Sequence, residues 1–204
     1  LHTRLLDAAN AQQADALGRL GVNLVHAAFS HWKQPRHLIE TLLEHVGRDR
    51  LEIDWIRVAG PAFKDVDNRL LGLHLVRLGY TPAVLFDVDG APLLASESIR
   101  HTRVLVERGR FAPVTNLNME MLDRARAAFE AATAPKPNAP RGPIREIMEV
   151  TMNNLRDRGT AEDADFLARV DLINTVGKMV LVSDIGAFHA LGEYLADRKV
   201  DATG

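Results

Sequence analysis

The sequence contains no cysteine. This absence excludes disulfide bonds, thiolate metal sites and a cysteine nucleophile. Proteins without disulfides are typical of reducing compartments, so we predict a cytoplasmic location. The histidines also lack the spacing of metal ligands, and we predict no metal site.

Long apolar runs and an excess of charge of one sign are also missing. No window approaches the ~18 to 20 consecutive apolar residues of a membrane-spanning helix, so we expect no membrane association. The net charge is −2 with both signs interleaved, which leaves no broad basic face, and nucleic acid is not an expected partner. With 47% hydrophobic residues, the composition is instead that of a globular protein with a sizeable core.

Helical and strand-like segments alternate along the 204 residues. Apolar periodicity predicts helices at 5–20, 37–46, 67–78, 119–132, 162–176 and 188–197. Runs rich in β-branched residues predict strands at 22–28, 51–58, 83–87, 103–107, 144–151 and 179–183. This alternation predicts an α/β fold with a largely parallel, Rossmann-like sheet and helices on both faces.

We expect residues 1–204 to form a single α/β domain. Four prolines within residues 134–143 exclude regular helix or central strand, so a lobe boundary at this loop is left open as an alternative. The chain starts at Leu1 rather than Met and stops at Gly204 just after a helical stretch. We therefore expect a fragment of a longer protein, whose remainder is a partner of this part.

The loops that follow the predicted strands are the expected ligand-binding positions, because ligands bind parallel sheets at the carboxyl ends of their strands. The loop after 103–107 contains Arg108, Gly109 and Arg110. Glycine permits close backbone approach, and the arginines suit a phosphate group. Two further loops add Asn153 and Asn154, which suit base or ribose recognition, and Ser183.

The segment 104–122 resembles the nucleotidylyltransferase superfamily, in which a strand leads through Gly-x-Phe-x-Pro-x-His-x-x-His into a helix. Gly109, Phe111 and Pro113 match that pattern in register, while Thr115 and Asn118 stand where the two histidines would be. The resemblance makes Thr115 and Asn118 the candidate catalytic residues. Neutral side chains donate hydrogen bonds to phosphates but supply no charge, so catalysis is in doubt. The alternative is that Thr115 or the following residue caps a helix.

A wider stretch, from Leu17 to Leu195, resembles a bacterial family commonly labelled nicotinate-nucleotide adenylyltransferase and sometimes TonB-dependent receptor. The resemblance is carried by the strings at 20–32, 66–70, 108–115, 152–155 and 165–171. It implies a nucleotide-binding protein related to nucleotidyltransferases, with an ATP- or NAD-type nucleotide and magnesium as its ligand.

A second motif resembles the nucleophile strand of haloacid-dehalogenase-like phosphatases. In residues 84–94, Asp87 and Asp89 match the two aspartates that attack phosphorus and move the leaving-group proton. The resemblance implies a magnesium-dependent phosphohydrolase. An Asp-Gly pair between apolar runs is also the commonest short hairpin signal. A third alternative is a non-catalytic domain that senses a small-molecule ligand or serves as a scaffold.

Overall fold

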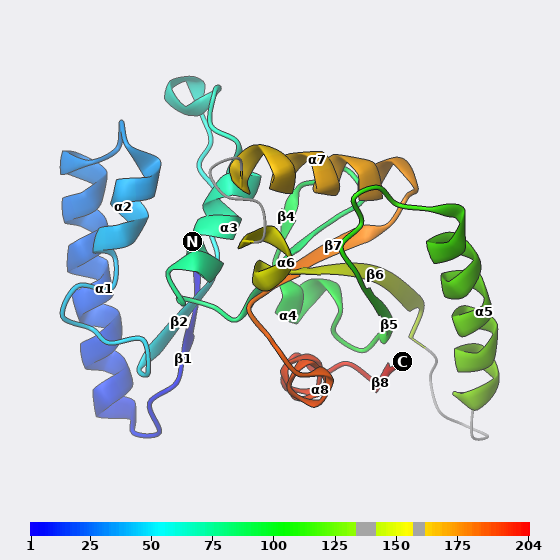
Figure 1. Cartoon of the computed structure of the whole chain (residues 1–204). Helices are drawn as coiled ribbons and strands as arrows, with labels where there is room; N and C mark the ends of the chain where they lie inside the picture. The colour runs from blue at the N-terminus through cyan, green and yellow to red at the C-terminus, as the bar shows by residue number, and fades with distance from the viewer. Residues whose placement is uncertain (134–141, 157–161) are drawn as a thin grey trace. The chain divides into compact units, whose positions relative to one another are not determined.

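The computed structural model describes residues 1–133, 142–156 and 162–204 (Figure 1). Contacts divide the chain into two compact units, Leu1–Val84 and Leu85–Gly204. The loop predicted as a lobe boundary lies almost wholly outside the described residues, and the division falls instead inside strand β3 (Ala83–Phe86). The single domain expected over residues 1–204 stays a prediction, and each unit is described by itself.

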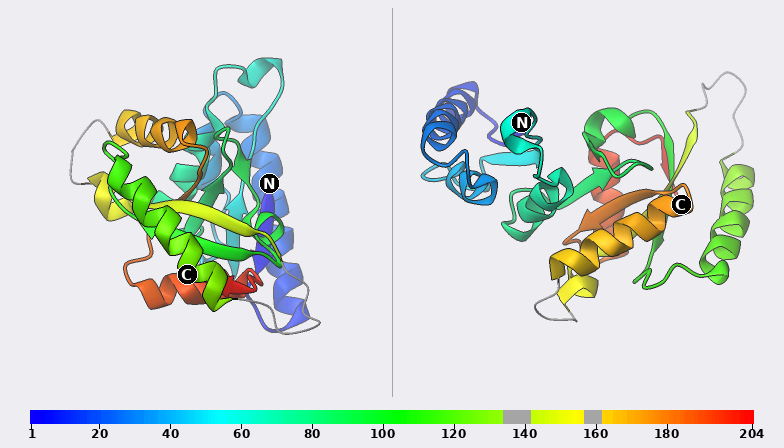
Figure 2. Two further views of the ribbon diagram at one scale, coloured as in Figure 1. Left: turned by 90° about the vertical axis from the view of Figure 1, so that its right-hand side faces the viewer. Right: turned by 90° about the horizontal axis from the view of Figure 1, so that it is seen from above.

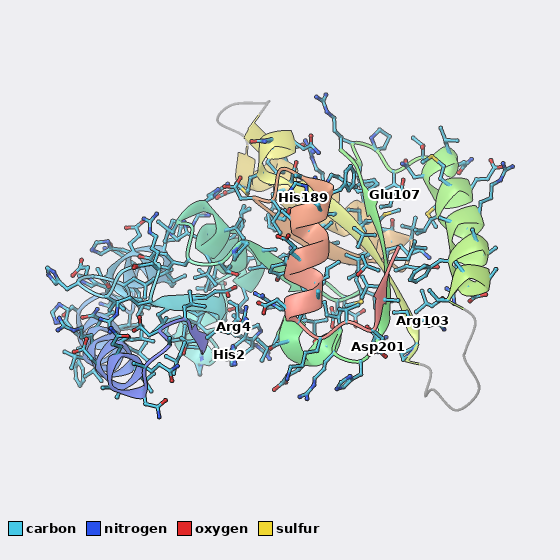
Figure 3. All side chains as sticks on the ribbon, turned by 90° about the horizontal axis from the view of Figure 1, so that it is seen from below. His2, Arg4, Arg103, Glu107, His189 and Asp201 are labelled. Atoms are coloured by element: carbon cyan, nitrogen blue, oxygen red, sulfur yellow. The ribbon has the colours of Figure 1, made fainter. Side chains whose placement is uncertain are left out.

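The first unit combines a two-stranded antiparallel sheet with helices. Its elements are β1 (His2–Leu5), α1 (Asn10–Ser30), α2 (Pro35–Thr41), β2 (Leu51–Trp55), a 3₁₀ turn (Pro61–Phe63) and α3 (Asn68–Arg77). Leu51 and Ile53 of β2 join the hydrophobic core with residues of all three helices. Glu52 and Asp54 alternate with these two residues along β2 and bind side chains of β1. Arg4 binds Glu52 at 2.9 Å, and His2 binds Asp54 at 2.5 Å (Figure 3).

The predicted strand at 22–28 is wrong, because α1 continues through Gly21 to Ser30. Two features misled the prediction: a glycine that resembles a helix stop, and a mostly apolar segment behind it, interrupted by Asn23 and His26. The segment is mostly apolar because two opposite faces of the helix carry apolar side chains. Strand β1 was missed, and it includes Leu5, where the helix was predicted to begin. The helix begins five residues later, at Asn10.

Helix α3 and the strand before it agree with prediction. The Asp67 carboxylate accepts a hydrogen bond from the Arg69 amide at 2.9 Å, which is the expected N-terminal cap. The same carboxylate binds the Arg69 guanidinium at 2.7 Å. Gly79 ends the helix with φ +66°, a conformation that favours glycine.

The second unit contains most of a six-stranded, mostly parallel sheet, so the chain is a mixed α/β protein. Its elements are β3, β4 (Pro92–Leu93), α4 (Ala95–Ser98), β5 (Arg103–Arg108), α5 (Asn116–Ala132), β6 (Ile144–Thr151), α6 (Met152–Arg156), α7 (Glu162–Thr175), β7 (Met179–Ser183), α8 (Phe188–Asp197) and β8 (Ala202–Thr203). The strand order is β4-β3-β7-β6-β5-β8. Neighbours β5/β6, β6/β7 and β5/β8 are parallel, and β3/β4 is an antiparallel hairpin.

Helices cover both faces of this sheet. In Figures 1 and 2, α7 lies on one face, while α4 and α8 lie on the other. The chain therefore leaves β6 toward one face and leaves β7 toward the opposite face. Strands β6 and β7 are the buried centre of the sheet, and all five residues of β7 are buried. Their carboxyl ends are thus the place where the connections diverge.

No helix in the described ranges combines the length and the apolar character needed to cross a membrane.

The cap of α3 generates a stability prediction. Burial raises the pKa of Asp67, but hydrogen bonds from Arg69 outweigh burial and hold that pKa below its ordinary value. Asp67→Ala should therefore lower the free energy of unfolding of the first unit by ~1 kcal/mol at pH 7. The wild-type advantage should shrink as the pH falls below about 4, because the unfolded carboxyl binds protons first. Urea titrations of both proteins at pH 7 and below about pH 4 measure this difference in the free energy of unfolding. The exposed Asp123→Ala on α5 is the matched control, and equal losses in both variants would contradict the cap.

Candidate ligand site

The carboxyl ends of β6 and β7 form the natural ligand position in this sheet. Parallel α/β sheets bind ligands where adjacent connections leave toward opposite faces, because the two loops then separate and open a crevice. Here α6 follows β6 directly at Met152, and the loop after β7 begins with Asp184. Figure 3 shows Glu107 and His189 near this end of the unit, and Arg103 and Asp201 at the opposite end.

A buried polar network connects the three central strands at this edge. Glu149 of β6 has a fully buried side chain and accepts hydrogen bonds from its two strand neighbours. Arg108 of β5 donates to both carboxylate oxygens, from Nε at 2.7 Å and from Nη2 at 3.0 Å. Ser183 of β7 donates its hydroxyl to Oε1 at 2.5 Å. A buried carboxylate requires such partners, since desolvation of an unpaired charge is very costly.

The strand register explains why these residues meet. Arg108 is the direct partner of Glu149 in the β5/β6 ladder, so both side chains point to the same face. Ser183 lies two residue pairs beyond Glu149 in the β6/β7 ladder, opposite Thr151. Side chains two positions apart share a face, which places the hydroxyl beside the carboxylate.

Arg108 also fixes the loop after β7. Its Nη1 donates to the carbonyl oxygen of Gly186 at 2.7 Å, and its guanidinium lies 4.6 Å from the ring centre of Phe188 in the first turn of α8. One side chain thus connects β5, β6 and the start of α8. Its positive charge is neutralised by Glu149, so Arg108 organises this edge.

The loop after β5 is anchored from several sides. The Gly109 amide donates to the main-chain oxygen of Glu149 at 3.1 Å, and the side-chain amide of Asn154 donates to the Gly109 oxygen at 3.3 Å. A side chain at position 109 would lie 2.9 Å from the buried ring of Phe111, so glycine is required by close contact. Phe111 itself has φ +45°, an unfavourable conformation for a non-glycine residue.

The next residue of this loop, Arg110, is exposed, and a buried arginine holds its backbone. Arg169 of α7 donates to the carbonyl oxygen of Arg110 at 2.9 Å and binds Asp165 at 2.5 Å. The backbone at Arg110 is therefore held by α7. Such support is what a binding side chain needs to keep its geometry.

The two candidate catalytic residues form the cap of α5. Thr115 and Asn118 make a reciprocal capping box, in which the Thr115 amide donates to Asn118 Oδ1 at 3.0 Å and the Thr115 hydroxyl donates to the same oxygen at 2.7 Å. The Asn118 amide nitrogen donates to Glu107 at 2.8 Å. Helix capping explains both residues, and the hydrogen bonds expected to reach a phosphate are made within the protein.

The sequence therefore predicted part of this network. Arg108 and Ser183 were predicted as ligand-binding residues, and both bind Glu149. Gly109 and Asn154, also predicted, are joined by a hydrogen bond. Asn153 is exposed on α6. The residue that joins the predicted ones, Glu149, was missed. An acidic residue within a strand whose neighbours are apolar was the available signal, because such a group is buried only with a partner.

The aspartates of the second motif belong to a hairpin turn. Strands β3 and β4 pair antiparallel, with Gly90 at φ +77°. Asp87 Oδ1 accepts hydrogen bonds from the amides of Asp89 and Ala91 at 2.9 and 2.8 Å. The hairpin interpretation is thus confirmed. Within the described ranges, no group of three or more histidine or acidic residues is arranged to hold a metal ion.

The network predicts a strong coupling between Arg108 and Glu149. Arg108→Ala should lower the free energy of unfolding by about 3–5 kcal/mol, because it leaves a buried carboxylate unpaired. Glu149→Gln in the same chain should restore a large part of the loss, since the neutral amide needs no counter-charge. Urea titration of the wild type, both single variants and the double variant forms the cycle. Additive losses would show that the pair is not coupled.

The cap of α5 predicts the behaviour of Thr115. Thr115→Ala should lower the free energy of unfolding by ~1 kcal/mol, and Thr115→Ser should retain most of it, because serine keeps the accepting oxygen. Thermal and urea unfolding measure the difference. Equal stability of the alanine and serine variants would contradict a capping role.

Comparison of the chain with protein-family models, with curated proteins and with solved structures gives no match. The assignment of a role to this edge therefore depends on its own geometry. That geometry is a divergence of loops between β6 and β7, a neutralised buried network beneath it, and an anchored loop that carries an exposed arginine.

Proposed function

We propose that the second unit is a Rossmann-like domain that binds a phosphorylated small molecule, with a nucleotide as the first choice, at the carboxyl ends of β5, β6 and β7. The observation that carries the proposal is the divergence of the chain after β6 and β7 toward opposite faces of the sheet. In parallel α/β sheets this is the position of the ligand crevice.

The polar groups around this position support an anionic ligand. We assign the phosphate to Arg110, because this residue is exposed in the loop after β5. A guanidinium binds phosphate oxygens through paired N–H donors. Asn153, exposed on α6, supplies an amide for hydrogen bonds to a base or ribose. The strained backbone of Phe111 also agrees with a site, since unfavourable conformations concentrate at binding loops.

We propose binding without adenylyl transfer. The resemblance to nucleotidylyltransferases would use Thr115 and Asn118 at the transferring phosphates, but their polar groups are bonded to each other and to Glu107. Neither residue carries the positive charge that stabilises a transferring phosphoryl group. We therefore propose a nucleotide ligand, as the resemblance implies, but not adenylyl transfer.

A test of this function compares ligands by thermal shift and calorimetry. ATP, NAD, nicotinate mononucleotide and inorganic phosphate are each measured with and without magnesium. A ligand that binds only the folded state raises the Tm. Arg110→Ala should weaken binding of the stabilising ligand at least ~10-fold, the effect of losing one charge-assisted contact of ~1.4 kcal/mol. The exposed Arg124→Ala on α5 is the matched control and should bind like the wild type.

Two results would contradict the proposal. One is the absence of any shift with all four ligands. The other is equal weakening in Arg110→Ala and Arg124→Ala, which would indicate unspecific attraction of anions. Magnesium-dependent release of phosphate that is lost in Asp87→Asn would favour the phosphohydrolase instead. Adenylyl transfer by the wild type would contradict the absence of a reaction.

A further inference from the structure

Helix α1 of the first unit presents an apolar stripe to solvent. Val22, Val25 and Phe29 expose 69%, 60% and 84% of their surface. Together with Gly18 they lie within about 60° of one another around the helix, because each residue advances 100°. A contiguous exposed apolar stripe of this kind marks an interaction surface more often than a solvated face.

The stripe is not needed for the core of the unit. The buried residues of α1 are Ala16, Leu20 and Ala27, which lie about 180° away around the helix. These residues belong to the hydrophobic core together with α2, β2 and α3. Helix α1 is therefore apolar on two opposite faces, and only one of them is used inside the unit. This is the feature that made residues 22–28 resemble a buried strand.

The stripe contains both a projection and a hollow. Phe29 is the most exposed large side chain on it, whereas Gly18 has no side chain. A cavity of about 580 Å³ opens beside Gly18, lined by Asp15, Gly18, Arg19, Val22, Asn23, Glu44 and His45. Its volume is ample for an aromatic ring. The projection and the hollow are separated by 11 residues, or about 16 Å along the helix.

This spacing makes the stripe complementary to itself. If two copies of α1 cross antiparallel about a two-fold axis between positions 23 and 24, Phe29 of each copy faces Gly18 of the other, and Val22 faces Val25. A two-fold interface requires such reciprocity, in which residue i meets residue j and j meets i. Small residues opposite large ones also let two helices approach closely.

The charges near the two features are also complementary. Lys33 lies four residues after Phe29, beyond the end of α1, and is exposed. Two acidic residues, Asp15 and Glu44, line the hollow. Asp15 is already bonded within its own chain, to Arg19 at 3.0 Å and to Arg50 at 2.9 Å. The charge contact that the pairing adds would therefore be between Lys33 of one copy and Glu44 of the other.

We propose that the protein forms a two-fold dimer through α1, with Phe29 of each copy seated in the Gly18 hollow of its partner. A contact through one helix from each copy is small compared with the ~1,200–2,000 Å² that stable specific interfaces bury. The dimer is accordingly a concentration-dependent one, and it is independent of the ligand site proposed for the second unit.

The test is sedimentation equilibrium of the chain across the micromolar range. The wild type should show a monomer–dimer equilibrium. Gly18→Leu fills the hollow and should raise the dissociation constant at least tenfold. A Cβ added at this position meets no atom within 4 Å in its own copy, and leucine favours the helix, so the Tm should not fall. Phe29→Ala should weaken the dimer similarly. The exposed Leu117→Ala on α5 is the control and should leave the dimer unchanged.

The absence of cysteine allows a direct test of the geometry. A mixture of Val22→Cys and Val25→Cys chains should form a disulfide between copies under mild oxidation faster than either variant alone, because the pairing places these positions opposite each other. Three results would overturn the proposal: a monomer throughout the concentration range, an unchanged dimer in Gly18→Leu, or a lower Tm of monomeric Phe29→Ala, which would show that the stripe is covered within one chain.

Discussion

The buried carboxylate of Glu149 is the constraint on which the second unit depends. A charge in the middle of a buried sheet is tolerated only with a counter-charge and satisfied hydrogen bonds, and Arg108 and Ser183 supply them from the two neighbouring strands. Their bonds hold the carboxyl ends of β5, β6 and β7 together at one level. Arg108 also donates a hydrogen bond to the Gly186 oxygen, so the same side chain holds the loop before α8.

This arrangement gives the edge of the sheet a rigid base and leaves the ligand contacts to the loops. The chain separates after β6 and β7, and the loop after β5 is anchored by Asn154 and Arg169 while Arg110 stays exposed. A preorganised base reduces the entropy lost when a ligand orders its contacts. Thr115 and Asn118 cap the start of α5 and stabilise that helix. Their role therefore differs from that of Arg110, the proposed phosphate contact.

The sequence predicted the longer helices and strands of the second unit, because the strands are short apolar runs and the helices have apolar periodicity. It did not predict the short elements α4, α6 and β8. It also located Arg108, Gly109 and Ser183 at strand ends. Glu149 could not be assigned from periodicity, since its role depends on partners 41 and 34 residues away. In the first unit, residues 22–28 were misread because a helix with two apolar faces has no single period of burial.

Hydrogen–deuterium exchange with and without the stabilising nucleotide reports where on the chain the ligand binds. We predict added protection in residues 108–113, 151–154 and 183–188, the segments at the carboxyl ends of β5, β6 and β7, and none at the opposite ends of these strands. Protection confined to the first unit, or spread evenly over the second, would contradict a ligand site at this edge of the sheet.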